Sequence, residues 1–556
     1  MNSPPQCVSR LHQKAPVSLL GMNKLNKTLP VAALLGLCAL IFFLRLHTYE
    51  EPLERDVTIY AVIAHEMLDG RALYSDLWDD KPPAIYVTYA AAELIAGYGR
   101  DSIFLMNVTA AVATLLACYF AGSAAGGGRI GGFVAAALWA LASGDLALQG
   151  NQPNTELFLN AFLATGFAVF VRKEKNGLGL RGAAFTGVLF ALASLYKQVA
   201  VVQAALLAIA YFASSRAGSR KKALAEMAIL AAIGVAAWAL VLGYFVAKGH
   251  GQAFREVMFL YDRYYAGNIW ENLSQMLSWP RVSSDVLVVT VSMAALSVIG
   301  MVLGLVFGPR RQWILFIALC IATHISVLLP GRPFPHYYQL WLPPLAIGGG
   351  WAVALMKRIL PASLSYLSYG VAGAACAVLI ALELPYYRLS AADWSAQKYG
   401  NIFLETDKLA YKIDNLLPPG ETFYEWGAES GLYFTSGRRP PSGIIFAYPM
   451  LAGPLAAKLS QRLLCDLERN RPDLIVFDGL TLANTPRGNP VLKWFEENYR
   501  PFSKTGMFSV RIAHPPLVIL AKDQFLLFAL KGGKLDAQKP GAGNETAKSL
   551  PVVGTF

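Results

Sequence analysis

Charged residues that could do chemistry gather at residues 50–86, where the sequence is EEPLERDVTIYAVIAHEMLDGRALYSDLWDDKPPAIY. Asp56 stands beside Arg55 at the expected start of an amphipathic helix. Lys81 comes directly before two prolines, which stiffen the chain. A carboxylate can accept a proton, and a fixed lysine can bind an anion. Charge alone proves little, because charge outside a bilayer costs nothing, so the arrangement of these residues carries the information.

The elements that must position these residues are membrane helices. Of the 556 residues, 55% are hydrophobic and 15% are charged, whereas a soluble domain usually carries about 25% charged residues. A spanning helix needs roughly 20 apolar residues. The apolar blocks predict about eleven transmembrane helices, with a range of ten to twelve because the third, fifth and sixth blocks are short: 29–46, 103–120, 130–142, 157–171, 183–195, 199–212, 227–246, 286–307, 313–329, 340–356 and 366–382.

Basic residues in the short loops predict the orientation. Cytoplasmic loops are enriched in Lys and Arg. With segment 1–28 inside, every expected cytoplasmic loop carries at least one basic residue, and most carry a cluster: Arg129; Arg172, Lys173, Lys175 and Arg181; Arg216, Arg220, Lys221 and Lys222; Arg310 and Arg311; Lys357 and Arg358. We therefore expect a multi-pass protein of the cell inner (plasma) membrane. The first apolar block is too long for a cleaved signal and is interpreted as a signal anchor, with Met1 and Met22 both open as the start.

The transmembrane domain, 29–384, is expected to carry two long outer loops, 47–100 and 248–285. In the first loop, Val57, Tyr60, Ala61, Ala64, Met67 and Leu68 recur at helical spacing. This spacing predicts an amphipathic helix lying on the membrane face. Two prolines at 82–83 then break the chain, and a further apolar helix is expected at 84–96.

The chain after residue 384 is ordinary in composition and predicts a small extracytoplasmic α/β domain, 385–530. TFYEW (422–426), GLYFTSG (431–437), PDLIVFD (472–478) and 517–521 are expected to be strands, and 451–469 a helix. From residue 531 the chain is polar and rich in Gly and Lys, so a disordered tail is expected at 531–556. The predicted fold class is an α-helical polytopic membrane protein with a C-terminal extracytoplasmic α/β domain.

Composition also bears on partners. The net charge of +12 could suit nucleic acid, but the positive charge lies in short loops between apolar blocks. Neither zinc-finger spacing nor a glycine-rich phosphate loop is present, so nucleic acid is rejected as a partner. No metal ligand set is assigned. A divalent cation stays open as a cofactor, because the chain has many acidic residues but no clear set of metal ligands among them.

Three motifs resemble the bacterial members of the membrane-embedded GT-C glycosyltransferases, in the protein mannosyltransferase and lipid A aminoarabinose transferase group. One is an acidic residue that opens a helix after the first span, followed by G-x-x-x-Y-x-D-x-W-x-x-K-P-P at 70–83. Another is N-T-E-L-F at 154–158, and the third is R-P-F-P-H-Y-Y-Q-L-W-L-P-P at 332–344. The resemblance covers most of the chain. The K-P-P segment is the most specific part, and the acidic positions are weakly specific alone.

The resemblance implies an inverting transfer of a sugar from a polyprenyl-phosphate donor to an acceptor hydroxyl on the outer face of the membrane. The acceptor is open among lipid A, another glycan, a lipid and a protein, and the sugar is open too. The lipid phosphate is the leaving group, so no nucleotide site is needed. A carboxylate would take the acceptor's proton, and cations would hold the phosphate and stabilise its growing charge.

By match to the family pattern, Asp56 is the candidate general base, with a helix N-cap as the alternative role. Glu156 is the candidate second carboxylate, and the alternative is an exposed residue at the end of a span. Lys81 is the candidate binder of donor phosphate or acceptor, against a lysine at the lipid headgroups. Lys197 resembles a family lysine that binds the donor, but a snorkelling lysine is an equal alternative.

Residues before the tenth span complete the implied site. Arg332 and Tyr338 are interpreted as donor-phosphate contacts, with an interfacial aromatic belt as the alternative. His336, Tyr337 and Asp80 are further candidates for the site. The rival function is a polytopic transporter or lipid flippase. Transporters usually show inverted repeats and polar residues in mid-span, whereas this chain shows no repeat and almost no charge in mid-span.

Overall fold

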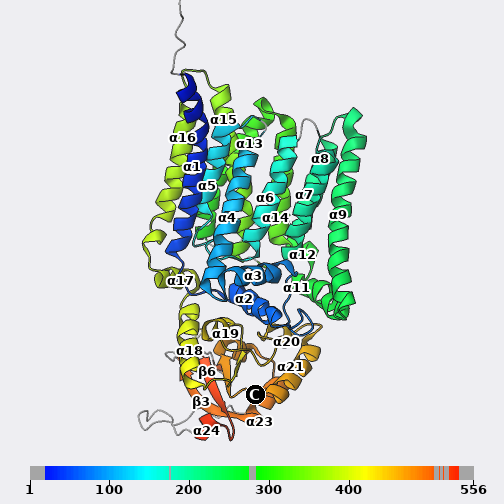
Figure 1. Ribbon diagram of the computed structural model, residues 1–556, viewed down its shortest axis with the longest axis vertical. Coiled ribbons are helices and arrows are strands. Elements are labelled where there is room, and N and C mark those ends of the chain that lie inside the picture. Colours follow the sequence, from blue (N-terminus) through cyan, green and yellow to red (C-terminus); the bar gives the residue numbers. More distant parts are fainter. Residues whose placement is uncertain are drawn as a thin grey trace, which may run out of the picture.

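A computed structural model describes residues 19–124, 126–173, 177–274, 284–332, 334–505, 512–513, 517–518 and 525–537. Figure 1 shows long helices lying side by side in one bundle, with a smaller domain of helices and strands at one end. Of the expected cytoplasmic segment 1–28, residues 1–18 lie outside the described chain. The first helix, α1, already begins at Leu19.

The bundle contains one helix for each of the predicted apolar blocks. Among the described residues, seven helices are long and apolar enough to cross a membrane, and α5, α8 and α16 are apolar but shorter. The bundle helices are α1 (Leu19–His47), α4 (Arg100–Gly122), α5 (Gly128–Ala142), α6 (Thr155–Lys173), α7 (Gly179–Tyr196), α8 (Ala200–Ala213), α9 (Arg220–Ala247), α13 (Ser284–Phe307), α14 (Arg310–Leu328), α15 (Leu342–Ile359) and α16 (Leu367–Glu383).

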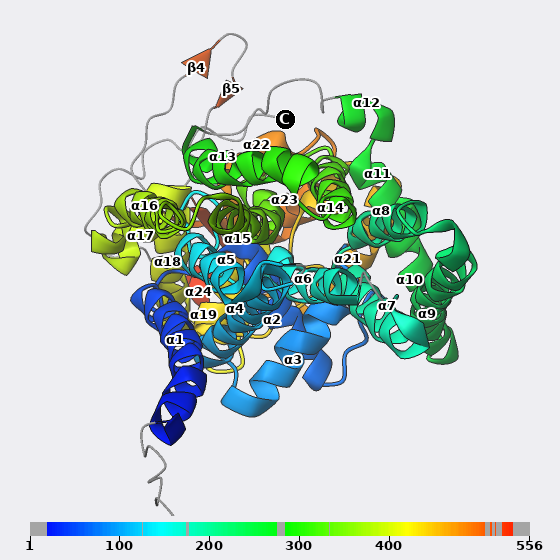
Figure 2. The ribbon, with the colours of Figure 1, turned by 90° about the horizontal axis from the view of Figure 1, so that it is seen from above.

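The helices of the bundle differ in how much of their surface is covered. Both views place α1 and α9 at opposite edges (Figures 1 and 2), where Leu35, Val235 and Leu240 are exposed. Viewed from above, α5 lies between α4 and α15 (Figure 2), and most of its residues are buried. Apolar side chains that point away from a bundle suit contact with lipid, so the edge helices are the expected lipid-facing surface.

A layer of short helices separates the bundle from the smaller domain. It contains α2 (Arg55–Leu68) and α3 (Ala84–Ala96), and the expected loop 248–285 contributes α10 (Gly251–Arg255), η2 (Glu256–Tyr261), α11 (Asp262–Ala266) and α12 (Ile269–Ser274). The amphipathic helix expected on the membrane face is α2. It lies instead between the bundle and the smaller domain, and the Thr58 hydroxyl contacts that of Ser430 at 2.7 Å. Because both neighbours cover it, most of α2 is buried, including every residue from Val57 to Ala64.

The smaller domain is built on a four-stranded sheet with the order β1-β2-β6-β3. Strands β1 (Phe423–Trp426) and β2 (Leu474–Asp478) pair in parallel and are buried throughout. Strand β6 (Phe525–Leu530) pairs antiparallel with β2 and with β3 (Tyr499–Thr505). Its residues alternate between buried and half-buried positions, which is typical of a strand with one covered face.

Helices complete this domain and connect it to the bundle. The connection is made by η4 (Tyr386–Arg388), α17 (Ala391–Tyr399) and α18 (Ile402–Leu416). The domain then adds α19 (Gly431–Ser436), α20 (Tyr448–Leu451), α21 (Ala456–Asn470), α22 (Gly479–Asn484) and α23 (Pro490–Asn498). Helices α20 and α21 lie where a helix was expected at 451–469. The remaining elements are η1 (Ala217–Ser219), η3 (Pro335–Trp341) and the pair β4 (Ile512–Ala513) and β5 (Leu517–Val518).

The structure bears on three predictions about the tail. The expected strand 431–437 is wrong, because the segment forms α19, whose Tyr433 ring stacks on Phe423 of β1 at 4.6 Å. Of the expected strand 517–521, only β5 lies within the described residues, and the apolar run that joins the main sheet is β6. Disorder was expected from residue 531, but α24 (Lys534–Ala537) forms there with Leu535 buried, and residues 538–556 lie outside the described chain.

Candidate active site

The first turn of α2 presents a pair of carboxyl groups. The N-cap of α2 is Glu54, whose side chain accepts a hydrogen bond from the Asp56 amide at 3.2 Å. Asp56 is therefore not the cap, although a cap was the alternative to its catalytic role. The Asn154 amide donates to Glu54 at 3.1 Å and to Asp56 at 3.4 Å, so it connects the two carboxyl groups.

Glu54 and Asp56 differ in their surroundings. Glu54 is buried and Asp56 is half-buried, and both line a cavity described below. Burial, together with the nearby Asp56, raises the pKa of Glu54 to about 8. The surroundings of Glu54 therefore favour its neutral form.

The K-P-P motif holds a second charged group. Lys81 forms an ion pair with Asp80 at 2.6 Å, and the Asp80 amide donates to Asp79 at 2.7 Å. The Tyr86 hydroxyl donates to the other Asp79 oxygen at 2.6 Å. The Tyr74 hydroxyl donates to the Lys81 carbonyl at 2.7 Å, which fixes the backbone just before the two prolines.

The pKa values of Asp79 and Asp80 shift in opposite directions. Burial, helped by Asp80, raises the pKa of Asp79 to about 8. Burial acts the same way on Asp80, but the adjacent Lys81 outweighs it and holds the pKa of Asp80 below its ordinary value. Burial works against the charge of Lys81, yet Asp80 and Asp79 raise its pKa well above the ordinary value. The segment therefore presents a permanently charged lysine.

A second lysine lies on the bundle side. Lys197 follows α7 and forms an ion pair with Glu156 of α6 at 2.6 Å. Glu156 is fully buried and also accepts from the Thr155 hydroxyl at 2.9 Å. The Lys197 nitrogen lies 3.4 Å from the centre of the Tyr337 ring. Lys197 thus points inward, not toward lipid headgroups. Glu156 does not line the cavity and contacts Lys197 instead.

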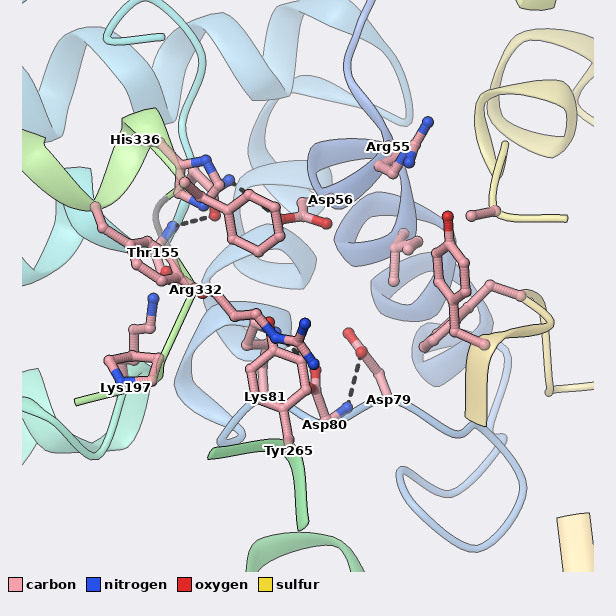
Figure 3. A pocket seen from close by; sticks show the side chains of 18 of the residues that line it. Arg55, Asp56, Asp79, Asp80, Lys81, Thr155, Lys197, Tyr265, Arg332 and His336 are labelled. Atoms are coloured by element: carbon pink, nitrogen blue, oxygen red, sulfur yellow. Dashed lines mark hydrogen bonds and ion pairs between the residues drawn. The ribbon is translucent and has the colours of Figure 1, made fainter. Parts of the chain in front are cut away.

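The segment before α15 contributes one exposed cation. Arg332 lies over the Tyr265 ring at 5.4 Å from its centre, and the Lys81 nitrogen is 5.9 Å from the same centre. Figure 3 shows Lys81, Arg332 and Tyr265 gathered in one part of the cavity. Within the described chain, Arg332 has no carboxylate at ion-pair distance. Arg332 is therefore available to an anion.

The three residues after Pro335 have different surroundings. His336 contacts the Gln149 side chain at 3.0 Å, and burial lowers the pKa of His336. Tyr337 is buried and lines the cavity beside Lys197. Tyr338 does not line the cavity and packs against the hydrophobic core. The expected phosphate contact by Tyr338 is thus not formed by this arrangement.

These residues surround one cavity of about 1140 Å³ between the bundle and the smaller domain. Of the expected site residues, the cavity brings together Asp56, Asp80, Lys81, Lys197, Arg332, His336 and Tyr337. The far wall comes from the smaller domain and its connection, and it is largely aromatic: Tyr399, Phe403, Phe446 and Tyr448. Residues of the loop after α9 also line it, including Tyr265 of α11.

Several residues of the cavity were not expected from the sequence. Asn154 stood inside a quoted motif, but only the fold shows that it contacts both Glu54 and Asp56. Gln149 has a φ of 55°, a backbone conformation that is strained for a residue other than glycine. Tyr265 and Lys398 carried no sequence signal. Among the described residues, no group of three or more His, Cys, Asp or Glu is arranged to hold a metal ion.

Comparison with solved structures identifies the fold. No protein-family model matches the chain, and the search of curated proteins gives no match. The crystal structure of ArnT from Cupriavidus metallidurans bound to undecaprenyl phosphate is similar, with a TM-score of 0.60 and 14% identity over 92% of this chain and 99% of ArnT. The archaeal oligosaccharyltransferase AglB from Archaeoglobus fulgidus, in complex with an inhibitory peptide and a dolichol-phosphate, gives 0.51 and 12% over 92% and 77%.

These likenesses span nearly the whole chain and include both the bundle and the smaller domain. The chain therefore has the fold of the GT-C glycosyltransferases, as its motifs indicated. At this level of identity the comparison establishes the architecture, and the chemistry must be argued from the cavity itself.

Proposed function

We propose that this protein is an inverting glycosyltransferase that moves a sugar from a polyprenyl-phosphate donor to an acceptor hydroxyl. The observation that carries the proposal is a single cavity whose lining includes Asp56 and the cations Lys81, Lys197 and Arg332. A transfer of this kind needs a proton acceptor for the hydroxyl and positive charge for the departing phosphate. Both lie here at one end of a membrane bundle.

The donor phosphate is assigned to the cationic side of the cavity. Lys81 and Lys197 are held by carboxylates at 2.6 Å, so their positions are fixed before a substrate arrives. Arg332 is exposed, and its guanidinium can form two parallel hydrogen bonds to one phosphate. The likeness to ArnT bound to undecaprenyl phosphate supports this placement. The scheme assigns the stabilisation of phosphate charge to these side chains, and a divalent cation stays an alternative supplier.

The reaction is a single displacement. Asp56 takes the proton from the acceptor hydroxyl, and the acceptor oxygen forms a bond to the anomeric carbon of the sugar. The bond from that carbon to the phosphate oxygen breaks, and polyprenyl phosphate leaves with the electron pair. Inversion follows because the nucleophile enters opposite the leaving group. Glu156, expected to be the second carboxylate, is reassigned as the residue that positions Lys197.

The acceptor is assigned to the aromatic side of the cavity and is a hydroxyl of lipid A, another glycan, a lipid or a protein. The protein is placed in the inner (plasma) membrane with its N-terminus cytoplasmic and its C-terminal domain outside. Tags at Asn176, which lies outside the described residues, and at Ser219 should be cytoplasmic. Tags at 50–78 and in the C-terminal domain should not be. Cytoplasmic labelling of the C-terminal domain would contradict this placement.

The test of function separates a transferase from a flippase. Purified protein is placed in vesicles together with lipid extract from its own cells, and polyprenyl-phosphate species are followed by mass spectrometry. A transferase converts the lipid-linked sugar to free polyprenyl phosphate, and one acceptor gains the mass of that sugar. A flippase moves the donor between leaflets without changing its mass. Movement without cleavage would replace the proposal by this rival.

A further inference from the structure

A second hollow lies at the end of the bundle opposite the active site. It is a groove of about 750 Å³ between the start of α5 and the end of α15, which we call the α5–α15 groove. Helix α15 begins beside the cavity and ends at Ile359, so its last turn lies at the far end from the smaller domain (Figure 1). The groove is lined by Gly126, Gly127, Gly128, Arg129, Ile130, Phe133, Val134, Ala354, Lys357, Arg358 and Tyr369.

Close helix packing explains why the groove exists. A Cβ on Gly131 of α5 would lie 3.2 Å from the Gly350 carbonyl oxygen, and one on Gly350 would lie 2.3 Å from the Gly131 oxygen. The two backbones therefore touch where only glycine fits. Beyond this crossing, the glycines at 126–128 add no side chains. The remaining space has an apolar wall made by Ile130, Phe133 and Ala354.

The rim of the groove is cationic. Lys357 donates to the Tyr369 hydroxyl and lies 4.7 Å from the centre of that ring. Arg358 donates to the Phe307 carbonyl at 3.4 Å and lies against Gly126, where a Cβ would be 3.0 Å from its terminal nitrogen. Arg129 supplies a third cation. None of the residues lining the groove is acidic, and within the described chain neither Lys357 nor Arg358 forms an ion pair.

We propose that the α5–α15 groove binds the phosphate headgroup of an anionic phospholipid from the leaflet opposite the active site. The three cations recognise the phosphate, and the acyl chains follow the apolar wall along α5. Basic pockets between membrane helices are suited to such headgroups, and each cation near them contributes about 1 kcal/mol, or roughly fivefold in affinity. A cation cluster that only orients the chain in the membrane would need no groove.

The experiment uses the full-length protein in detergent and native mass spectrometry with added cardiolipin, phosphatidylglycerol or phosphatidylethanolamine. The groove variant carries Arg129→Gln, Lys357→Gln and Arg358→Gln. Its matched control carries Arg216→Gln, Arg220→Gln and Lys221→Gln, three exposed cations at the same end of the bundle that do not line the groove. The groove variant should bind cardiolipin and phosphatidylglycerol roughly 100-fold more weakly, and the control should change by less than about threefold.

Single variants Lys357→Gln and Arg358→Gln keep the test decisive where the triple variant does not fold. Each should weaken the affinity for the anionic lipids by about fivefold. Equal losses of lipid affinity in the groove and control variants would overturn the proposal, because they would show a general attraction between the basic surface and anionic lipids. Retention of phosphatidylethanolamine as strong as that of cardiolipin would overturn it too. Displacement of the lipid by millimolar inorganic phosphate would show that the groove takes free phosphate instead. Sugar transfer should be unchanged in the groove variant, so failure here leaves the proposed function intact.

Discussion

The active-site cavity and the α5–α15 groove both gather cations, but they hold those charges in opposite ways. In the cavity, most cations are matched by a carboxylate within 2.6 Å: Lys81 with Asp80, Lys197 with Glu156, Arg55 with Glu429, and Lys398 with Glu51. At the groove, the polar partners of Lys357 and Arg358 among the described residues are a hydroxyl, a ring and a backbone carbonyl, and neither cation forms an ion pair there.

The difference follows from burial. A buried charge is costly unless it is paired, and the side chains of Lys398 and Glu51 are each only 1% exposed. Lys357 and Arg358 are exposed, so they keep their water and need no charged partner. Pairing also fixes the position of a side chain, so the paired cations of the cavity are positioned before a reaction begins. The unpaired cations of the groove attract anions by a charge interaction that salt can screen.

The largest expected effect is on turnover. Asp56→Asn keeps the size of the side chain but cannot take a proton, so sugar transfer by the purified protein should fall by about 10²- to 10⁴-fold. The control is Arg358→Gln in the groove, which should leave transfer within about twofold because it is a surface change far from the cavity. Near-normal transfer by Asp56→Asn would remove Asp56 as the base.

The difference in ion pairing between the cavity and the groove can be tested by removing one carboxylate. Glu156→Gln leaves Lys197 buried without a counter-charge, so the free energy of unfolding should fall by about 3–5 kcal/mol. Lys357→Gln at the groove should change it by less than about 0.5 kcal/mol. Thermal unfolding in detergent measures both variants. Equal stability of the two would mean that the Lys197–Glu156 pair does not stabilise the native state.

Arg332 is the cavity residue that most resembles the groove cations, since it is exposed and lacks a carboxylate within the described chain. If it binds the donor phosphate, Arg332→Ala should weaken polyprenyl-phosphate affinity by about 10- to 100-fold, the worth of a charge-assisted hydrogen bond. Arg332→Lys keeps the charge but loses the paired geometry and should retain part of the affinity. Unchanged affinity in Arg332→Ala would leave Arg332 as an anchor at the headgroups.

Much of the fold was predictable because membrane helices are determined by long local patterns. Apolar length and loop charge are read directly from the chain, and every predicted block is a helix. The tail was harder to predict. Short apolar runs suit either a strand or a helix, so 431–437 was assigned as a strand, although packing on β1 makes it α19. Likewise, the burial of α2 depends on a domain that begins more than 300 residues later.

Site residues could be predicted where they belong to a sequence motif. They could not be predicted where only tertiary packing brings them to the cavity. Asp56, Lys81 and Lys197 reach one cavity as expected. The partner of Lys197 is Glu156, 41 positions away, and no local pattern distinguishes a carboxylate that contacts substrate from one that holds a lysine. Tyr338 stood in the same motif as Tyr337, but the turn of η3 directs it to the core.

The smallest expected effect concerns the protons of buried carboxyl groups in the cavity wall. The pKa of Asp79 is raised to about 8, whereas an unfolded aspartate titrates near about 4, so only the native state holds this proton between those values. The resulting stability is complete below about pH 4 and is lost as pH rises to about 8.

Asp79→Asn cannot titrate, yet its side-chain oxygen can still accept a hydrogen bond from the Tyr86 hydroxyl. Its unfolding temperature should therefore fall less than that of the wild type between pH 5 and 9. The slope should not vanish, because the pKa values of Glu54 and Asp262 are also raised to about 8, chiefly by burial. Parallel profiles for the two proteins would show that Asp79 is charged in the native state, in which case its Tyr86 contact, not a stored proton, holds the K-P-P segment in place.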